Sequence, residues 1–236
     1  MRIEQQPAYV LHARAYRETS LLLECLTRDQ GRVGVVARGV RGERSRLRRA
    51  QLEPFQDLRM DLLLRGELAT LTGVESSGPG LSITGDAALA GLYLNELVVR
   101  MTERNDPAPV VFAAYARTLT RLAGDEPLAW TLRRFERDLL DAIGYALPLQ
   151  FDAHSGEPLE PAASYHYHVG DGAVRCAPGT SQALLGSDLL ALSSDQPPDA
   201  RGLLALRDMM RAVIRFHLGG GELRSWRVLA MTGSRR

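Results

Sequence analysis

Residues 28–49 read RDQGRVGVVARGVRGERSRLRR, and this stretch decides how the rest of the chain is interpreted. Its first half holds an apolar run, Val33 to Ala37, that follows the turn signal Asp29-Gln30-Gly31. Its second half has no apolar period, and eight arginines against two acidic residues give the whole stretch a net charge of +6. We therefore expect a strand that runs into an arginine-rich, phosphate-seeking loop, because a merely solvated charge run usually mixes signs.

This stretch contains the third of five strand-like segments near the N-terminus. The segments are 8–15, 20–27, 32–38, 55–64 and 67–75, each rich in Val, Leu, Thr or aromatic residues. Turn signals such as Arg65-Gly66 separate them. Five short strands in about 75 residues suit an OB-type Greek-key barrel, whose face and loops bind oligonucleotides. An SH3-like barrel remains the structural rival.

Helical periodicity begins after the boundary sequence Ser76-Ser77-Gly78-Pro79-Gly80. We expect helices that begin near Thr84 or Asp86, before Val111, at Asp125 and after Pro197-Pro198. Residues 146–182 form a small, irregular insertion that contains β-structure and is rich in Gly, Pro and His. The expected fold class is α+β: an OB-type barrel domain over residues 1–80 and a mainly α-helical domain over residues 81–236.

Composition limits the classes of function. The 236 residues are 45% hydrophobic and 24% charged, as in soluble globular proteins. No apolar stretch has the length of a membrane span or a signal peptide, so we expect a cytoplasmic protein. Two cysteines without a CxxC pair exclude a disulfide framework. The chain has no lysine, which excludes lysine Schiff-base chemistry and a Walker-type phosphate loop.

Charge is distributed unevenly along the chain. Residues 1–80 carry +3, residues 81–200 carry −8 and residues 201–236 carry +6. On the last predicted helix, Arg207, Arg211 and Arg215 recur every fourth residue and align along one side. The helix that begins at Asp125 carries Arg133, Arg134 and Arg137 off its apolar stripe, so we expect these three side chains to point toward solvent or a groove. The sequence thus predicts two basic surfaces around an acidic middle.

The histidines of the insertion raise the possibility of a metal site. His166 and His168 share one face of a strand, and His154, Cys176, Asp152 or Asp171 could complete a tetrahedral set. No CxxC or HxxxH pair supports a metal site. We therefore favour the alternative, surface histidines on a small β-ribbon. We expect no metal and no other cofactor.

Several motifs resemble one known family. They are YVLHARAYRETSLLLECLTRDQGRVGVVARGVR at 9–41, LEPF at 52–55, GLYLNEL at 91–97, LRRFERDLL at 132–140, IGYAL at 143–147 and LGGGELRSWRVL at 218–229. In this order they resemble the bacterial RecO family of recombination and repair proteins. The resemblance implies an OB domain, a helical domain, ATP-independent annealing of complementary strands, and loading of recombinase, together with RecR, onto DNA covered by single-strand-binding protein. Many family members carry a four-cysteine zinc site in the insertion, but this chain keeps only Cys176 there, so zinc is not carried over.

Arginine is the residue we expect to contact single- and double-stranded DNA, because it binds phosphates and stacks on bases. The expected DNA-binding residues are Arg14, Arg17, Arg32, Arg38, Arg41, Arg44, Arg46, Arg48, Arg49, Arg207, Arg211 and Arg215. Tyr9, Tyr16 and Phe55 are candidate stacking partners, although each could be a core residue. DNA as the ligand places the chain at the nucleoid.

The resemblance at LRRFERDLL also implies a site for the acidic C-terminal tail of single-strand-binding protein. Arg133 would meet the terminal carboxylate of the tail, while Phe135 and Leu139 would shape a pocket for its last aromatic side chain. Arg suits this role because its planar fork can grip a carboxylate with two parallel hydrogen bonds.

Two other functions compete with this interpretation. Asp57, Asp61, Glu67 and Glu75 could form a metal-dependent nuclease site on the barrel, but outward acids on alternating strand positions are expected anyway. An OB-fold RNA-binding module would explain the first 80 residues and leave the acidic helical region without a role. The chain lacks GxSxG, HExxH and strand-associated GxGxxG motifs, so we do not expect an enzyme.

Overall fold

The computed structural model describes residues 1–40 and 49–226. The chain packs as two compact units, which are Met1–Asp125 with the described residues from Leu223 onward, and Glu126–Glu222. These packing units divide after Asp125, whereas the predicted domain boundary is at residue 80. The boundary at residue 80 stays a prediction.

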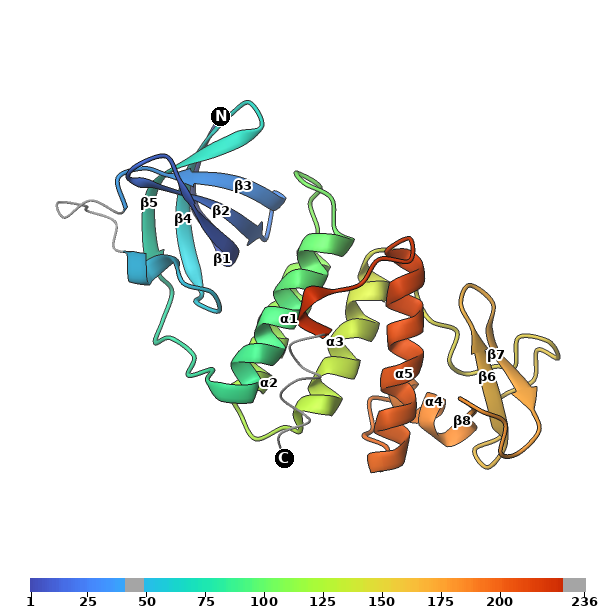
Figure 1. The fold of residues 1–236 in the computed structure, drawn as a ribbon. Coiled ribbons are helices and arrows are strands. Elements are labelled where there is room, and N and C mark those ends of the chain that lie inside the picture. Colours follow the sequence, from blue (N-terminus) through green and yellow to red (C-terminus); the bar gives the residue numbers. More distant parts are fainter. Residues whose placement is uncertain (41–48, 227–236) are drawn as a thin grey trace. The chain divides into compact units, whose positions relative to one another are not determined.

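The first unit begins with a closed barrel of five strands in the order β1-β2-β3-β5-β4 (Figure 1). The strands are β1 (Arg2–Tyr16), β2 (Ser20–Thr27), β3 (Gly31–Ala37), β4 (Leu58–Arg65) and β5 (Leu68–Ser76). Neighbours are antiparallel except β3 and β5, which pair in parallel and close the barrel. The predicted OB-type barrel is confirmed. Strand β1 begins six residues earlier than predicted and β4 begins three residues later.

Period-2 alternation explains why β3 is a barrel strand. Val33, Val35 and Ala37 are buried, while Arg32 and Val36 on the opposite face are only partly covered. The core is apolar throughout and includes Val10, Leu23, Met60, Leu62 and Leu71 from the other four strands. Gly31 enters β3 with a φ of +63°, and a Cβ there would lie 1.7 Å from the carbonyl oxygen of Asp106. Only glycine fits that turn.

Two helices follow the barrel in the same unit, α1 (Gly85–Met101) and α2 (Pro109–Leu122), and a short 3₁₀ turn, η1 (Arg49–Leu52), lies between β3 and β4. A buried polar chain ties them to β1. Asn95 of α1 donates from Nδ2 to the carbonyl oxygen of Leu11 at 2.9 Å, and the hydroxyl of Tyr115 on α2 donates to Asn95 Oδ1 at 2.6 Å. Because all three groups are satisfied, the helices have one defined position against the barrel.

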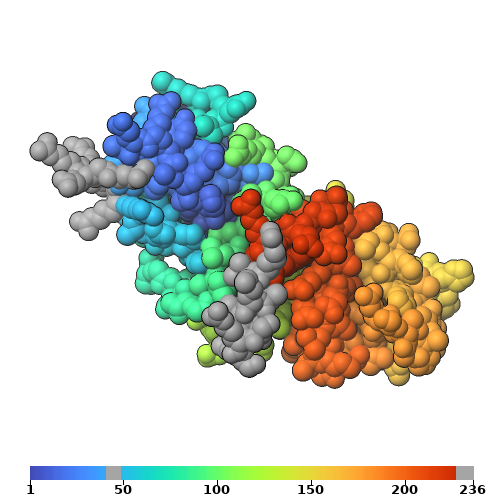
Figure 2. Space-filling model, viewed as in Figure 1, coloured from blue at the N-terminus to red at the C-terminus, as the bar shows by residue number. Residues whose placement is uncertain are grey.

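The second unit contains helices and a small sheet. Its elements are α3 (Leu128–Ala142), β6 (Ser164–His168), β7 (Gly172–Cys176), β8 (Leu184–Leu185), α4 (Gly186–Ser193) and α5 (Ala200–His217), and the sheet order is β7-β6-β8. Figure 2 shows the insertion and α5, coloured yellow-orange to red, as parts of one continuous surface. The predicted helical region with a β-containing insertion is confirmed. Across the described ranges 1–40 and 49–226, no helix has the length and apolar character needed to cross a membrane.

Helix α3 corrects one prediction. Arg133 was expected to face solvent or a groove, but it is only 5% exposed, and its Nε donates to Glu136 Oε2 at 2.7 Å. Arg134 and Arg137 are also mostly covered, with side chains 15% and 20% exposed, and both contact Asp195. The three arginines are paired within the unit because carboxylates lie one turn away along α3 or on the loop after α4. The pattern of i,i+3 opposite charges therefore does not mark a solvated face here.

Candidate nucleic-acid interface

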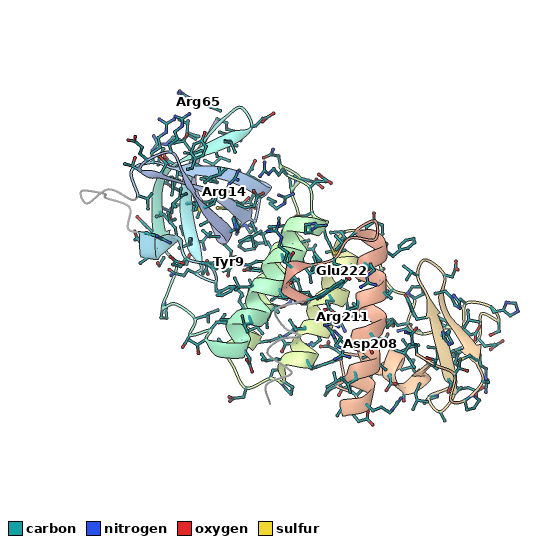
Figure 3. All side chains as sticks on the ribbon, viewed as in Figure 1. Tyr9, Arg14, Arg65, Asp208, Arg211 and Glu222 are labelled. Carbon is teal, nitrogen blue, oxygen red and sulfur yellow. The ribbon has the colours of Figure 1, made fainter. Side chains whose placement is uncertain are left out.

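The outer face of β1, β2 and β3 carries the arginines of the first predicted basic surface. Arg14 pairs with Leu22, and Leu22 pairs with Val36, so these residues form one row across three strands. Tyr16 and Arg38 lie one step further along on the same face, because side chains two apart on a strand point the same way. Figure 3 labels Arg14 among the barrel strands.

The loop after α1 covers one end of this face. Arg32 donates from Nη2 to the carbonyl oxygen of Thr102 at 2.7 Å and from Nη1 to Glu24, and its side chain is 11% exposed. Arg104 also binds Glu24, at 2.5 Å from Nη2 to Oε2. Arg32 is therefore part of the joint between the barrel and α1, and we leave it out of the interface proposed below.

The other end of the face is open. A pocket of about 560 Å³ lies there, and its lining residues are Tyr16, Arg17, Glu18, Thr19, Ser20, Val36, Arg38 and Gly39. The guanidinium carbon of Arg17 lies 5.2 Å from the centre of the Tyr16 ring, a cation–π contact. Arg17 has a φ of +53°, a conformation that costs a non-glycine residue free energy and that recurs at functional sites.

Free positive charge distinguishes this open end. Arg14, Arg17 and Arg38 are exposed and form no ion pair with any residue in the described ranges. Arg49, at the start of η1, lies 3.8 Å from Glu53, and its side chain is 70% exposed. The remaining predicted members of the segment, Arg41, Arg44, Arg46 and Arg48, lie outside the described residues. Arg17 and Arg38 line the pocket, and together with Arg14 on the same face their guanidinium groups provide donors for several phosphate oxygens.

The three candidate stacking residues have different positions. Tyr9 is 5% exposed and packs against Phe112 and Tyr115 at centroid distances of 5.3 and 5.2 Å, and burial raises its pKa to about 12. The ring of Phe55 lies so close to Gly91 of α1 that a Cβ there would be 2.7 Å from it. Tyr9 and Phe55 therefore pack against the helices, whereas Tyr16 lines the open pocket.

The second predicted basic surface, on α5, is partly neutralised. Arg207 pairs with Asp208 at 2.9 Å, and Arg215 pairs with Glu222 at 2.9 Å. Arg211 is half-buried between them, and Figure 3 shows it on α5 with Asp208. All four paired side chains are at least 41% exposed. Such exposed pairs are worth at most about 1 kcal/mol, so a phosphate group can compete with the carboxylates.

The residues implied for the tail of single-strand-binding protein lie together on α3. Phe135 and Leu139 are 0% and 1% exposed, and Arg133 is held by Glu136. Phe135 and Leu139 are four residues apart and share one face of α3, whereas Arg133, two residues before Phe135, points to another side of the helix. In this structure the fork of Arg133 is occupied by a carboxylate of the same helix.

The histidines and the barrel acids were the candidate metal ligands. Within residues 1–40 and 49–226, no group of three or more His, Cys, Asp or Glu is arranged to hold a metal ion. His166 and His168 do share a strand, with ring centroids 6.4 Å apart. On the barrel, Asp61 accepts a hydrogen bond of 2.9 Å from the backbone N–H of Gln5 and so has a local structural partner.

Sequence reasoning missed the role of Glu24 and Arg104. Both are ordinary charged residues in the sequence, one on β2 and the other just after α1, 80 positions apart. No local pattern signals a contact over that separation. The position of Glu24 on β2 offers one hint. Glu24 shares the outward face of the strand with Leu22, and Leu26, two residues further along that face, is buried.

Comparison with known proteins matches both parts of the chain to one family. The model described as Recombination protein O N terminal matches residues 1–79, and Recombination protein O C terminal matches residues 84–227. A "DNA repair protein RecO" of Xanthomonas euvesicatoria is 46% identical, with both chains covered in full. Proteins of the same name from Stenotrophomonas maltophilia and Xanthomonas campestris are 45% and 44% identical over 100% and 97% of each chain.

Proposed function

Because the chain belongs to the RecO family of DNA repair proteins, we propose that it binds DNA on the open end of the barrel face and anneals complementary strands. A role in DNA repair and recombination follows from the family itself. The site, the annealing and the partners are the proposal. DNA as the ligand would place the protein at the nucleoid.

One observation supports the site above all others. Arg17 and Arg38 line the pocket beside Tyr16, Arg14 lies two residues before Tyr16 on β1, and none of the three pairs with an acid in the described part of the chain. Several other arginines already form ion pairs with acids; they include Arg32, Arg133, Arg134 and Arg137. Phosphates would bind the guanidinium groups, and a base would stack on the ring of Tyr16. This combination is sequence-tolerant, as a protein that anneals arbitrary strands needs.

Salt dependence of binding tests the site directly. Each phosphate contact on single-stranded DNA contributes about 0.7 to the slope of log K against log salt. We expect the Arg17→Ala, Arg38→Ala double variant to lower that slope by roughly 1.4, measured by fluorescence anisotropy with a labelled oligonucleotide. Arg65 is exposed on the β4–β5 hairpin, outside this face (Figure 3), so Arg65→Ala removes one charge as a control.

The two variants separate a local site from general charge. If Arg65→Ala lowers the slope as much per charge as the double variant does, the barrel binds DNA only through its net charge and the proposed site is wrong. Running the titration with RNA of the same sequence addresses the alternative of an RNA-binding module, which would bind RNA more tightly than DNA.

Annealing requires two strands held near each other. We propose the α5 arginines, Arg207, Arg211 and Arg215, as contacts for the second strand or for duplex DNA, with the exposed acids displaced by phosphate. Bound arginines screen the repulsion between two phosphate backbones, and proximity then raises the rate of pairing. Neither nucleotide hydrolysis nor a reaction of the chain is needed. Faster annealing of oligonucleotides coated by single-strand-binding protein, without ATP, is the expected result.

Two protein partners complete the proposal, and both rest on the family resemblance. RecR would act with this chain when recombinase is loaded. The acidic tail of single-strand-binding protein would bind α3 through Arg133, Phe135 and Leu139. Since Glu136 already occupies Arg133, the terminal carboxylate of the tail must take its place, and α3 must be accessible to the tail.

A further inference from the structure

The insertion between α3 and α4 is too small to have a large core of its own. Within residues 146–182 the buried apolar residues are Leu149, Leu159, Tyr165 and Ala173. Units below about 40 residues usually need a disulfide, a metal or a partner to fold stably. The two free cysteines of the chain are Cys25 in the barrel and Cys176 in the insertion, so a disulfide within the insertion is not possible. The insertion packs in the same unit as α3, α4 and α5, and β6 pairs with β8 directly before α4, so its loops rely on this packing and on their own hydrogen bonds.

One buried carboxylate joins the two halves of the insertion. Asp152 is 6% exposed, and its Oδ1 accepts the backbone N–H groups of His154 at 2.8 Å and Ser155 at 3.0 Å. Its Oδ2 accepts the backbone N–H of Arg175 on β7 at 2.9 Å, 23 residues further along the chain. The first two bonds shape the loop of residues 153–156. The third fixes that loop to the sheet.

Main-chain hydrogen bonds around the same residue complete the junction. The N–H of Asp152 donates to the carbonyl oxygen of Glu157 at 2.8 Å, and the N–H of Gly156 donates back to the carbonyl oxygen of Asp152 at 2.8 Å. Ala153 donates to the carbonyl oxygen of Ala173 at 2.7 Å. Every polar group of Asp152 is therefore used, in a tight loop closed by Gly156 with a φ of +76°.

The residues present do not fit the zinc that the resemblance implies for many family members. Zinc sites of this kind need four ligands, mostly thiolates. Here Cys176 is the one thiol of the insertion, and both oxygens of Asp152 are directed at backbone N–H groups rather than left free. The described residues offer no set of three His, Cys, Asp or Glu side chains placed around one point. The donor set belongs to a hydrogen-bonded junction and not to a metal centre.

We infer that Asp152 replaces a structural metal ion in this chain, so that the insertion folds without zinc around a buried carboxylate. A carboxylate suits this role because it accepts several N–H groups at once, and hydrogen bonds to an ionised acceptor are stronger than neutral ones. A metal ion gathers ligands from two loops by coordination. Asp152 gathers backbone N–H donors from two separate segments, the loop of residues 153–156 and strand β7, in the same way.

Metal analysis of the wild-type full-length protein is the first test, and it needs no variant. Elemental analysis should find zinc far below one equivalent, and a chelator should leave the thermal unfolding midpoint unchanged. Stoichiometric zinc, or a midpoint that falls when the chelator is added, overturns the inference.

Hydrogen exchange of backbone amides is the second test, with Asp152→Asn as the variant. The asparagine oxygen can still accept hydrogen bonds from the N–H groups of His154 and Ser155. Its NH₂ group faces the N–H of Arg175, and two donors cannot form a hydrogen bond with each other. We expect exchange at Arg175 to rise by about tenfold or more, because a partly buried N–H donor loses its charged acceptor. Asp171→Asn, on the exposed β6–β7 turn, removes the same charge and should change nothing at Arg175.

The barrel provides an internal reference for folding. The amide of Val35 in β3 should exchange equally in wild type and Asp152→Asn, so loss of the insertion alone is distinguished from loss of the whole fold. Unchanged exchange at Arg175 in Asp152→Asn would show that the carboxylate does not hold β7, and the inference would fail.

Discussion

Arg104, just after α1, donates a hydrogen bond of 2.5 Å from Nη2 to Oε2 of Glu24 on β2. Arg32 on β3 binds the other carboxylate oxygen of Glu24, so one acid pairs with two arginines at the covered end of the barrel face. Burial opposes ionisation of Glu24, but the hydrogen bonds from Arg104 and Arg32 outweigh it and lower its pKa below the ordinary 4.5. This contact divides the face into an end that joins α1, where both arginines are paired, and an open end whose arginines form no ion pair with another described residue.

The first prediction concerns Glu24→Gln. Removing one member of a mostly buried ion pair leaves Arg32 uncompensated, and we expect a loss of roughly 3 kcal/mol in the free energy of unfolding. Because the pKa of Glu24 is lowered by folding, its stabilisation is present above pH 4.5 and is lost as pH falls through the folded-state pKa. The difference between wild type and variant should therefore shrink at acid pH, as measured by chemical denaturation.

Glu75→Gln provides the matched control for this measurement. Glu75 is exposed near the end of β5, and an exposed substitution of this kind usually changes stability by at most about 0.5 kcal/mol. A Glu24→Gln variant that is as stable as this control at neutral pH would show that the joint to α1 does not depend on the carboxylate.

The second prediction concerns Tyr16, which lines the open pocket. Stacking of one base on an aromatic ring is worth about 1 to 3 kcal/mol, so Tyr16→Ala should weaken single-strand binding by roughly fivefold to 150-fold. Tyr16→Phe keeps the ring and should bind nearly as wild type. The salt slope should be the same in all three proteins, because the ring carries no charge. Equal affinity of wild type and Tyr16→Ala would remove stacking from the site.

Local patterns predicted much of the fold. The five barrel strands were recognisable because each is rich in Val, Leu, Thr or aromatic residues, and turn signals such as Asp29-Gln30-Gly31 and Arg65-Gly66 separate several of them. The helices followed from apolar spacing near 3.6. Barrel closure through the parallel β3–β5 pair is different, because Val35 meets Ala69 and Val36 meets Thr70 across more than 30 residues. Only analogy to the OB fold predicted that closure.

The candidate site was predicted less completely than the fold, for a physical reason. Charge content showed where arginines are abundant, but pairing decides which of them are available. Arg32 lies near the start of β3 and Arg38 directly after its end, yet Arg32 is bound by Glu24 and the loop after α1, while Arg38 forms no ion pair with another described residue. Arg133 was misplaced because its partner, Glu136, looks like part of a solvated i,i+3 pair until burial is known.

The third prediction concerns the buried polar chain beneath the barrel. Tyr115→Phe removes the hydroxyl that donates to Asn95 Oδ1 and leaves that oxygen without this partner in a buried site. We expect a loss of about 1 to 3 kcal/mol in the free energy of unfolding. Tyr145→Phe serves as the control, because Tyr145 is 49% exposed and water can satisfy its hydroxyl. Equal stability of the two variants would mean that the hydroxyl of Tyr115 contributes nothing.

The fourth prediction tests whether Arg133 receives the tail of single-strand-binding protein. Glu136 holds the guanidinium of Arg133 within the helix, so it competes with any tail carboxylate. Arg133→Ala should weaken binding of a labelled tail peptide by about tenfold or more, since a charge-assisted hydrogen bond is worth about 1.5 to 3 kcal/mol. Glu136→Gln should strengthen binding several-fold, because the competing carboxylate is gone.

Opposite effects of the two substitutions are what separate a binding site from a structural pair. If Arg133 and Glu136 only stabilise α3, both substitutions lower stability and neither changes peptide affinity in the folded protein. Asp138→Asn removes one negative charge from the same helix and controls for long-range attraction of an acidic peptide, which would raise affinity equally in Asp138→Asn and Glu136→Gln. A gain confined to Glu136→Gln, with thermal unfolding followed in parallel, would assign the carboxylate of the tail to Arg133. Equal gains in the two variants would leave only a general charge effect, and the tail would bind elsewhere.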